Sequence, residues 1–200
     1  NPEGLTRYNI VPGLIGTILT MTMVMLTSLA MTRERERGTM ENLLATPVRP
    51  LEVMLGKIAP YVMIGYVQLG VIILAAVLLF EVPIVGSLAL LMGVIGLANL
   101  GVGFTFSTLA TNQLQAMQMT FFFFLPSMLL SGFMFPFRGM PPWAQWLGEL
   151  LPLTHFLRVV RAIMLKGATF GEIVPNLWPM ALFLGGVGAI ALKRYRQTLD

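Results

Sequence analysis

The stretch VPIVGSLALLMGVIGLANLGVGFTFSTLATNQLQAMQMTFFFFLPSMLLSGFMFPF, residues 82–137, contains no charged side chain. A helix needs roughly 20 predominantly apolar residues to cross the hydrocarbon core of a membrane, which is about 30 Å thick. The stretch is more than twice that long, so we expect it to cross a membrane, turn and cross back. Polar residues near its midpoint predict the turn: Thr111, Asn112, Gln113 and Gln115.

Three further runs lack charged side chains and are long enough to cross a membrane. They lie between Arg7 and Arg33, at 58–80 and at 173–192. Over the whole chain, 56% of residues are hydrophobic and 11% are charged, whereas soluble domains carry about 25% charged residues. The sequence therefore predicts an all-α polytopic helix bundle, one transmembrane domain over residues 1–200, with spans at 10–31, 58–80, 88–110, 117–137 and 177–192.

Basic residues predict the orientation, because Lys and Arg accumulate in cytoplasmic loops. The segment 33–57 and the tail after residue 192 are rich in them, so we expect both in the cytoplasm and 138–176 outside. The net charge of +4 follows from this topology, and no nucleic-acid partner is expected. The absence of cysteine excludes disulfides and thiolate metal sites. Because the chain starts at Asn1 without a signal-peptide pattern, we interpret it as the C-terminal part of a longer protein.

The region 138–176 is too polar for another span, yet its apolar residues recur at helical spacing. They predict a short helix lying in the outer interface, with Trp143 and Trp146 just upstream; its apolar face comprises Leu153, Phe156, Leu157, Val160, Ile163 and Met164. On its opposite face, His155, Arg158 and Arg161 are candidates for contact with substrate or lipid headgroups. The alternative is that they are ordinary interfacial residues, and too few carboxylates or histidines surround His155 to predict a metal site.

Polar and small residues inside the spans predict helix packing. Gln68 and Asn99 lie near span centres, where such residues more often join helices by hydrogen bonds than bind cargo. Small residues permit close approach of neighbouring helices in the third and fifth spans: Gly93, Gly96, Gly101, Gly103, Gly185 and Ala189.

The segment RERERGTMENLLATP, residues 33–47, directly follows the first span. Its alternating charges favour a solvated helix. An apolar stripe of Met40, Leu43, Leu44 and Pro47 runs along it, and a stripe outside the bilayer needs a covering partner. These residues alone leave two interpretations open: a charged collar next to the membrane, or a docking helix for a cytoplasmic partner.

Three segments resemble one known family. ERERGTMENLLATPVRPLEVMLGK (34–57) is similar to the segment after the second membrane helix in permease subunits of type-2 ATP-binding-cassette (ABC) exporters, in their multidrug-efflux-like bacterial branch. LLSGFMFPFRGMPPWAQWL (129–147) and LPLTHFLRVVRAIMLKG (151–167) resemble that family's outer re-entrant region.

The resemblance implies a function and partners. The chain would be the C-terminal portion of a bacterial inner-membrane exporter permease, working as a dimer with a second permease on hydrophobic or amphiphilic substrates. The segment after the first span would couple it to a cytoplasmic ATP-binding subunit through Glu34, Arg35, Glu36, Arg37, Gly38, Thr39, Met40, Glu41, Leu43, Leu44 and Pro47.

The chain has no phosphate-binding loop of the form GxxxxGK[ST]. Its Gly56-Lys57 pair is followed by Ile58, and Leu51 stands at the position of the first glycine. We therefore expect ATP and Mg on a separate polypeptide, and no catalytic residue, cofactor or metal in this chain. One alternative is an ion-coupled carrier working alone, which generally needs an ionisable residue within the membrane; the interiors of the predicted spans have none. The other, a noncatalytic scaffold, leaves the charged segment unexplained.

Overall fold

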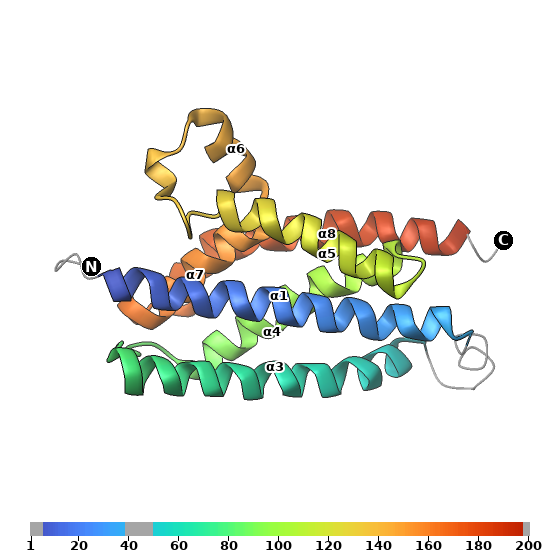
Figure 1. Ribbon diagram of the computed structural model, residues 1–200, viewed down its shortest axis with the longest axis horizontal. Coiled ribbons are helices and arrows are strands. Elements are labelled where there is room, and N and C mark those ends of the chain that lie inside the picture. The colour runs from blue at the N-terminus through green and yellow to red at the C-terminus, as the bar shows by residue number, and fades with distance from the viewer. Residues whose placement is uncertain (1–5, 39–49, 198–200) are drawn as a thin grey trace.

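The computed structural model describes residues 6–38 and 50–197, and within these ranges every regular element is a helix. Long helices run side by side along the longest axis of the molecule, and a smaller unit projects from one side (Figure 1). In chain order the elements are α1 (Thr6–Glu36), α3 (Pro50–Phe80), α4 (Leu88–Leu109), α5 (Gln113–Leu130), the 3-10 helix η1 (Phe137–Gly139), α6 (Pro142–Leu150), α7 (Pro152–Lys166) and α8 (Phe170–Gln197).

Helix α1 lies at the centre of the bundle and packs against α3, α4, α5 and α7. Its buried face contributes Ile15, Leu19 and Met23 to the main core. Several hydroxyls on α1 donate within the helix, as Thr17 Oγ1 does to the carbonyl of Gly13 at 2.9 Å. The buried Oγ1 atoms of Thr20 and Thr27, in contrast, have no partner among the described residues. A helix with apolar neighbours on most sides is the stable arrangement for a sequence that is hydrophobic nearly all round.

Among the described residues, three helices are long and apolar enough to cross a membrane: Tyr8–Ala30, Ala59–Phe80 and Leu88–Leu109. They coincide with the first three predicted spans. Helices α5 and α8 cover the remaining two, but their crossing of the membrane stays a prediction. In α5, the glutamines of its first two turns lower the mean hydropathy.

The boundaries of the last two predicted spans differ from the structure. Helix α5 ends at Leu130 rather than near residue 137, and the chain then turns at Gly132, whose φ of +80° suits glycine. Helix α8 starts at Phe170, seven residues before the predicted span, and continues through Pro175 and Pro179. Apolar composition predicted the spans, but it does not report where the backbone turns.

Helix α7 covers the predicted interfacial helix, and its location at a membrane interface stays a prediction. Its predicted apolar face is buried as expected, but that face packs inside the bundle against α1 and α8. Ten of its residues are buried in total, including His155 on the face predicted to be exposed. Helical periodicity indicates that one face of α7 must be shielded from water. The turns at 131–151 bring that face against other helices of the bundle.

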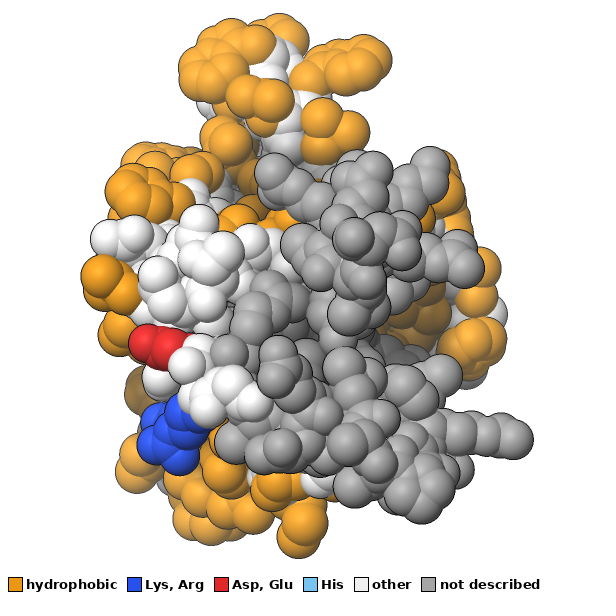
Figure 2. Space-filling view, turned by 90° about the vertical axis from the view of Figure 1, so that its right-hand side faces the viewer, with side chains coloured by type: hydrophobic (Ala, Val, Ile, Leu, Met, Phe, Trp, Pro, Cys, Tyr) orange, Lys and Arg blue, Asp and Glu red, His pale blue; other side chains and the backbone are white. Residues whose placement is uncertain are grey.

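Helix α6, in contrast, is largely exposed. Trp143 and Trp146 have exposed fractions of 66% and 78%, and only Ala144 and Gly148 are buried. This unit projects from the bundle (Figure 1), and the end view shows apolar side chains covering the projection (Figure 2). An apolar projection with tryptophans is typical of a membrane interface, which stays a prediction for α6.

Candidate functional sites at the two ends of the bundle

The charged end of α1 is continuous with its apolar part. The helix runs on past Thr32 to Glu36, and the Arg37 amide still donates to the carbonyl of Arg33 at 3.0 Å. Gly38 follows with a φ of +68°, the left-handed conformation that commonly ends a helix. The side chains of Arg33, Glu36 and Arg37 are exposed. A rigid helix therefore carries charges of both signs out of the bundle.

Glu36 ties this end of α1 to the first residue of α5. Its Oε2 atom accepts hydrogen bonds from Gln113 Nε2 at 2.7 Å and from the Gln113 backbone amide at 3.3 Å. Arg33 Nε donates to Gln113 Oε1 at 3.4 Å. A carboxylate at a helix N-terminus also interacts favourably with the helix dipole. Oppositely charged side chains lie next to each other among polar surface at this end (Figure 2).

The structure describes only part of the predicted coupling segment. Glu34 and Arg35 lie on the last turn of α1, and Glu36, Arg37 and Gly38 follow at its exposed end. The other predicted residues lie outside the described ranges: Thr39, Met40, Glu41, Leu43, Leu44 and Pro47. Their role stays a prediction. Sequence reasoning missed Gln113 as the neighbour of Arg33 and Glu36, although it predicts the polar turn that contains Gln113.

At the opposite end, a polar cluster joins α6 to α7. Arg158 forms two hydrogen bonds to the carboxylate of Glu149, at 2.9 and 2.5 Å, and its guanidinium lies 4.8 Å from the centre of the Phe137 ring. His155 is 6% exposed; its Nε2 lies 2.8 Å from the Glu149 carbonyl and its Nδ1 lies 3.4 Å from Asn176 Oδ1. The hydrogen bond from Arg158 holds the pKa of Glu149 below its usual range.

Arg161 is half-buried and has weak partners. Its two Nη atoms lie 3.5 and 3.4 Å from the carbonyl of Gly132, and its buried Nε has no hydrogen-bond partner among the described residues. Burial lowers the pKa of Arg161. Together with Arg158, it lines a cavity of about 590 Å³ between α7 and α8, whose other lining residues are Ala162, Leu165, Lys166, Ala168, Glu172 and Asn176.

His155 lies outside this cavity, so the three predicted contact residues do not form one site. Arg158 and Arg161 line the cavity together with Lys166 and Asn176, and His155 is not among its lining residues. Sequence reasoning missed Lys166 and Asn176. Lys166 carried a detectable signal, because it is a third cation on the same helix as Arg158 and Arg161. Contact with substrate or lipid stays a prediction for all three predicted residues.

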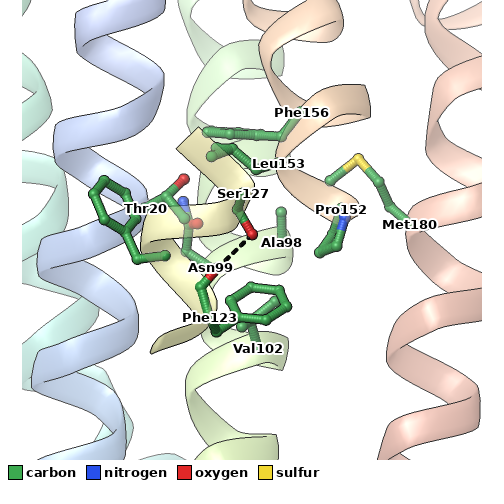
Figure 3. A pocket seen from close by; sticks show the side chains of 11 residues that line it. Thr20, Ala98, Asn99, Val102, Phe123, Ser127, Pro152, Leu153, Phe156 and Met180 are labelled. Carbon is green, nitrogen blue, oxygen red and sulfur yellow. Dashed lines mark hydrogen bonds between the residues drawn. The ribbon is translucent and has the colours of Figure 1, made fainter. Parts of the chain in front are cut away.

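A smaller pocket lies in the middle of the bundle, where α1, α4, α5, α7 and α8 meet (Figure 3). Its volume is about 20 Å³, which is room for one water molecule and too little for cargo. Thr20 Oγ1 lines it and has no partner among the described residues, while Ser127 Oγ donates to the Phe123 carbonyl at 2.6 Å. Asn99 donates within its own helix, to the carbonyl of Ile95 at 3.1 Å.

Gln68 and Asn99 were predicted to join helices by hydrogen bonds, and Gln68 does so. Its Nε2 atom on α3 donates to Thr22 Oγ1 on α1 at 3.2 Å. The hydrogen bond of Asn99 described above does not reach a second helix.

The family model for ABC-2 type transporters matches residues 2–165. The chain belongs to the ABC-2 type transporter family. Proteins of Escherichia coli that are similar to it include the probable multidrug ABC transporter permease YbhR, 33% identical over 100% of this chain and 55% of its own length. Another is the probable multidrug ABC transporter permease YbhS, 36% identical over 98% of this chain and 54% of its own length.

A third relative within the family is the inner membrane transport permease YhhJ of Escherichia coli, 38% identical over 90% of this chain and 50% of its own length. The chain thus spans about half the length of these curated relatives. Family membership and the apolar helices together identify a multi-pass membrane protein of the ABC-2 type transporter family.

Proposed function

We propose that this chain is the membrane part of a permease subunit in an ABC exporter of the bacterial inner membrane. It forms the translocation path for a hydrophobic or amphiphilic substrate, together with a second permease. A separate cytoplasmic subunit binds ATP and Mg and supplies the energy. The names of YbhR and YbhS, which contain "multidrug", support an amphiphilic cargo.

The observation that carries the proposal is the continuity of α1. A permease driven by an external ATPase needs a stiff connection from the cytoplasm into the bundle. Helix α1 supplies one, because it extends from the core to the exposed charges at Glu36 and Arg37 without interruption. It packs against four other helices on the way.

The contact between Glu36 and Gln113 adds a second element to this connection. A displacement of the segment 33–47 acts on α1 directly and on α5 through the hydrogen bonds of Gln113. Helices α1 and α5 also pack against each other along their length, where Ser28 and Thr120 hydroxyls lie 3.3 Å apart. We infer that the two helices move as one unit when the ATPase changes state.

Replacing Leu44 by Asp tests the coupling segment. The proposed contact with the ATPase would bury this side chain, and an unpaired charge in a desolvated interface costs several kcal/mol. We expect normal membrane insertion, loss of the ATPase on co-purification and loss of export. Asn42→Ser in the same segment is the control and should change neither. If the Leu44 variant keeps both its partner and full export, the assignment of the segment is wrong.

The assignment of ATP hydrolysis to a separate subunit leads to a second prediction. The full permease, purified without its partner, should hydrolyse ATP only at background level, since residues 51–58 lack the pattern of a phosphate-binding loop. Turnover that persists after removal of contaminating ATPases would contradict the assignment of ATP to another subunit.

An ion-coupled carrier remains the second candidate, because the structure buries His155 inside the bundle. Such a carrier would transport without an ATPase and would respond to collapse of the proton gradient. Transport by permease-containing vesicles that persists without ATP and stops with a protonophore would favour it over the exporter.

A further inference from the structure

We propose that the cavity between α7 and α8 binds the anionic headgroup of an amphiphile, with a phosphate-like group held by Arg161 and Lys166. The membrane phospholipid phosphatidylglycerol has this chemistry, and so does an anionic amphiphilic cargo. The proposal concerns the outer end of the bundle and does not depend on coupling to an ATPase.

The charges of the lining favour an anion. Three cationic side chains line the cavity, and Glu172 is the one carboxylate among its lining residues. Arg158 is already neutralised by Glu149, at 2.9 and 2.5 Å. Glu172 Oε2 is occupied at the start of α8, where it accepts from the Thr169 amide at 2.7 Å and the Thr169 hydroxyl at 3.0 Å. These hydrogen bonds come from neutral donors and leave the charge of Glu172 in place. The three cations of the lining, set against the two carboxylates of Glu149 and Glu172, give a net charge of +1, which favours an anion.

Arg161 carries the strongest part of the argument. Its guanidinium is half-buried, yet its partner is a carbonyl at 3.4–3.5 Å, and its buried Nε has no partner among the described residues. Burial of a charge is costly unless the charge is paired and hydrogen-bonded. A phosphate can accept two parallel hydrogen bonds from a guanidinium, which makes it a suitable ligand for such an arginine.

The remaining lining suits the rest of an amphiphile. Ala162, Leu165 and Ala168 form an apolar wall next to the cations, and Asn176 adds a polar amide. The volume of about 590 Å³ lies within the range of small-molecule sites and exceeds the need of a bare phosphate ion. A mixed lining of this kind fits a headgroup together with the start of its apolar body.

The position of the cavity agrees with the depth of lipid headgroups. It lies beside the end of α7 at Lys166 and the first turns of α8. Trp178, two turns along α8, is 58% exposed. Tryptophan is enriched at the interface between the membrane core and water.

Native mass spectrometry of the full permease with its partner subunit tests the proposal. The complex is purified in detergent with equal amounts of phosphatidylglycerol and phosphatidylcholine that carry the same acyl chains. We expect preferential retention of phosphatidylglycerol, and a reduction of about fivefold or more in each of Arg161→Gln and Lys166→Gln, since charge-assisted hydrogen bonds are the strong ones. Lys166→Arg should keep the preference.

Arg138→Gln is the matched control. Arg138 is an exposed arginine on η1 outside the cavity, and its replacement removes the same charge. It should leave the ratio of bound lipids unchanged. Equal loss in Arg138→Gln and Lys166→Gln, or no preference in the wild type, would overturn the proposal. Lys166 is exposed, so Lys166→Gln decides the matter even if Arg161→Gln fails to fold.

Competition distinguishes the sources of the anion. Soluble glycerol 3-phosphate has the anionic group without the acyl chains and should displace phosphatidylglycerol poorly, because it lacks the part that contacts Ala162 and Leu165. If glycerol 3-phosphate displaced the lipid at the same concentration as short-chain phosphatidylglycerol does, the site would bind free phosphates. This result would overturn the proposal that the ligand is an amphiphile. Reduced lipid retention under an excess of an exported anionic amphiphile would identify cargo as a ligand of the same site.

Discussion

Glu149 connects two helices through both of its polar groups. Its carboxylate pairs with Arg158 on α7, while its carbonyl lies 2.8 Å from Nε2 of the buried His155. The end of α6 is thereby held against α7, although α6 itself is mostly exposed. A few polar contacts thus determine where the projecting unit meets the bundle.

The lowered pKa of Glu149 predicts a pH-dependent effect of Glu149→Gln. A carboxyl group with a depressed folded-state pKa stabilises the fold above its ordinary value of 4.5, and this stability is lost as the pH falls through the lower, folded-state pKa. At neutral pH we expect Glu149→Gln to unfold more easily, by about 0.2–1 kcal/mol as for other partly exposed ion pairs. Thermal unfolding in detergent measures this, and the difference from the wild type should shrink below pH 4.5. A difference that is independent of pH would contradict the prediction.

Glycines on α4 determine how closely its neighbours approach. A Cβ atom on Gly103 would lie 2.6 Å from Thr27 Cβ and 3.1 Å from the backbone carbonyl of Val24, both on α1. A Cβ atom on Gly96 would lie 2.7 Å from the Tyr66 hydroxyl of α3. Gly93 has nothing within 4 Å of the same position. The small residues of the third span therefore serve packing within the bundle at some positions and not at others.

This difference predicts opposite effects for two alanine substitutions in one helix. Gly103→Ala should destabilise the protein by about 1–3 kcal/mol, because the α1 backbone would have to move. Gly93→Ala, the matched control, should be neutral or stabilise by up to about 1 kcal/mol through helix propensity. Denaturation of the purified variants compares them. Equal stability of the two variants would show that α1 and α4 are not in close contact at Gly103.

In the described part of the chain, the hydrogen bonds of charged side chains between elements lie at two opposite ends. The charged end of α1, the turn between α4 and α5, and the C-terminal end of α8 lie at one end, whereas α6 and the start of α8 lie at the other (Figure 1). The hydrogen bonds between Glu36 and Gln113 agree with this arrangement. Alternating helix directions therefore place the end of α1, the start of α3 and the turn at Thr111 on the same side (Figure 1).

Cysteine labelling tests the orientation in the membrane, because the chain has no native cysteine. In a full permease whose other cysteines are replaced, Gly139→Cys should react in intact cells with a reagent that cannot cross membranes. Thr111→Cys should react only after the cells are opened, since the basic residues at 33–57 favour the cytoplasm. Both positions are exposed. Labelling of Thr111→Cys in intact cells would reverse the proposed topology.

Hydropathy by itself determined the all-α membrane bundle, the first three spans and the turn at 111–113, because long uncharged runs have few ways to avoid water. Periodicity identified the buried face of α7 for the same reason. The location of α7 inside the bundle, the burial of His155 and the junction of Glu36 with Gln113 were decided only by the tertiary structure. So was the cavity that brings Arg161 and Lys166 together. Each of these features depends on which helices meet after the chain turns. The burial of apolar side chains is non-directional and does not specify a particular neighbour, whereas close packing of the whole bundle does.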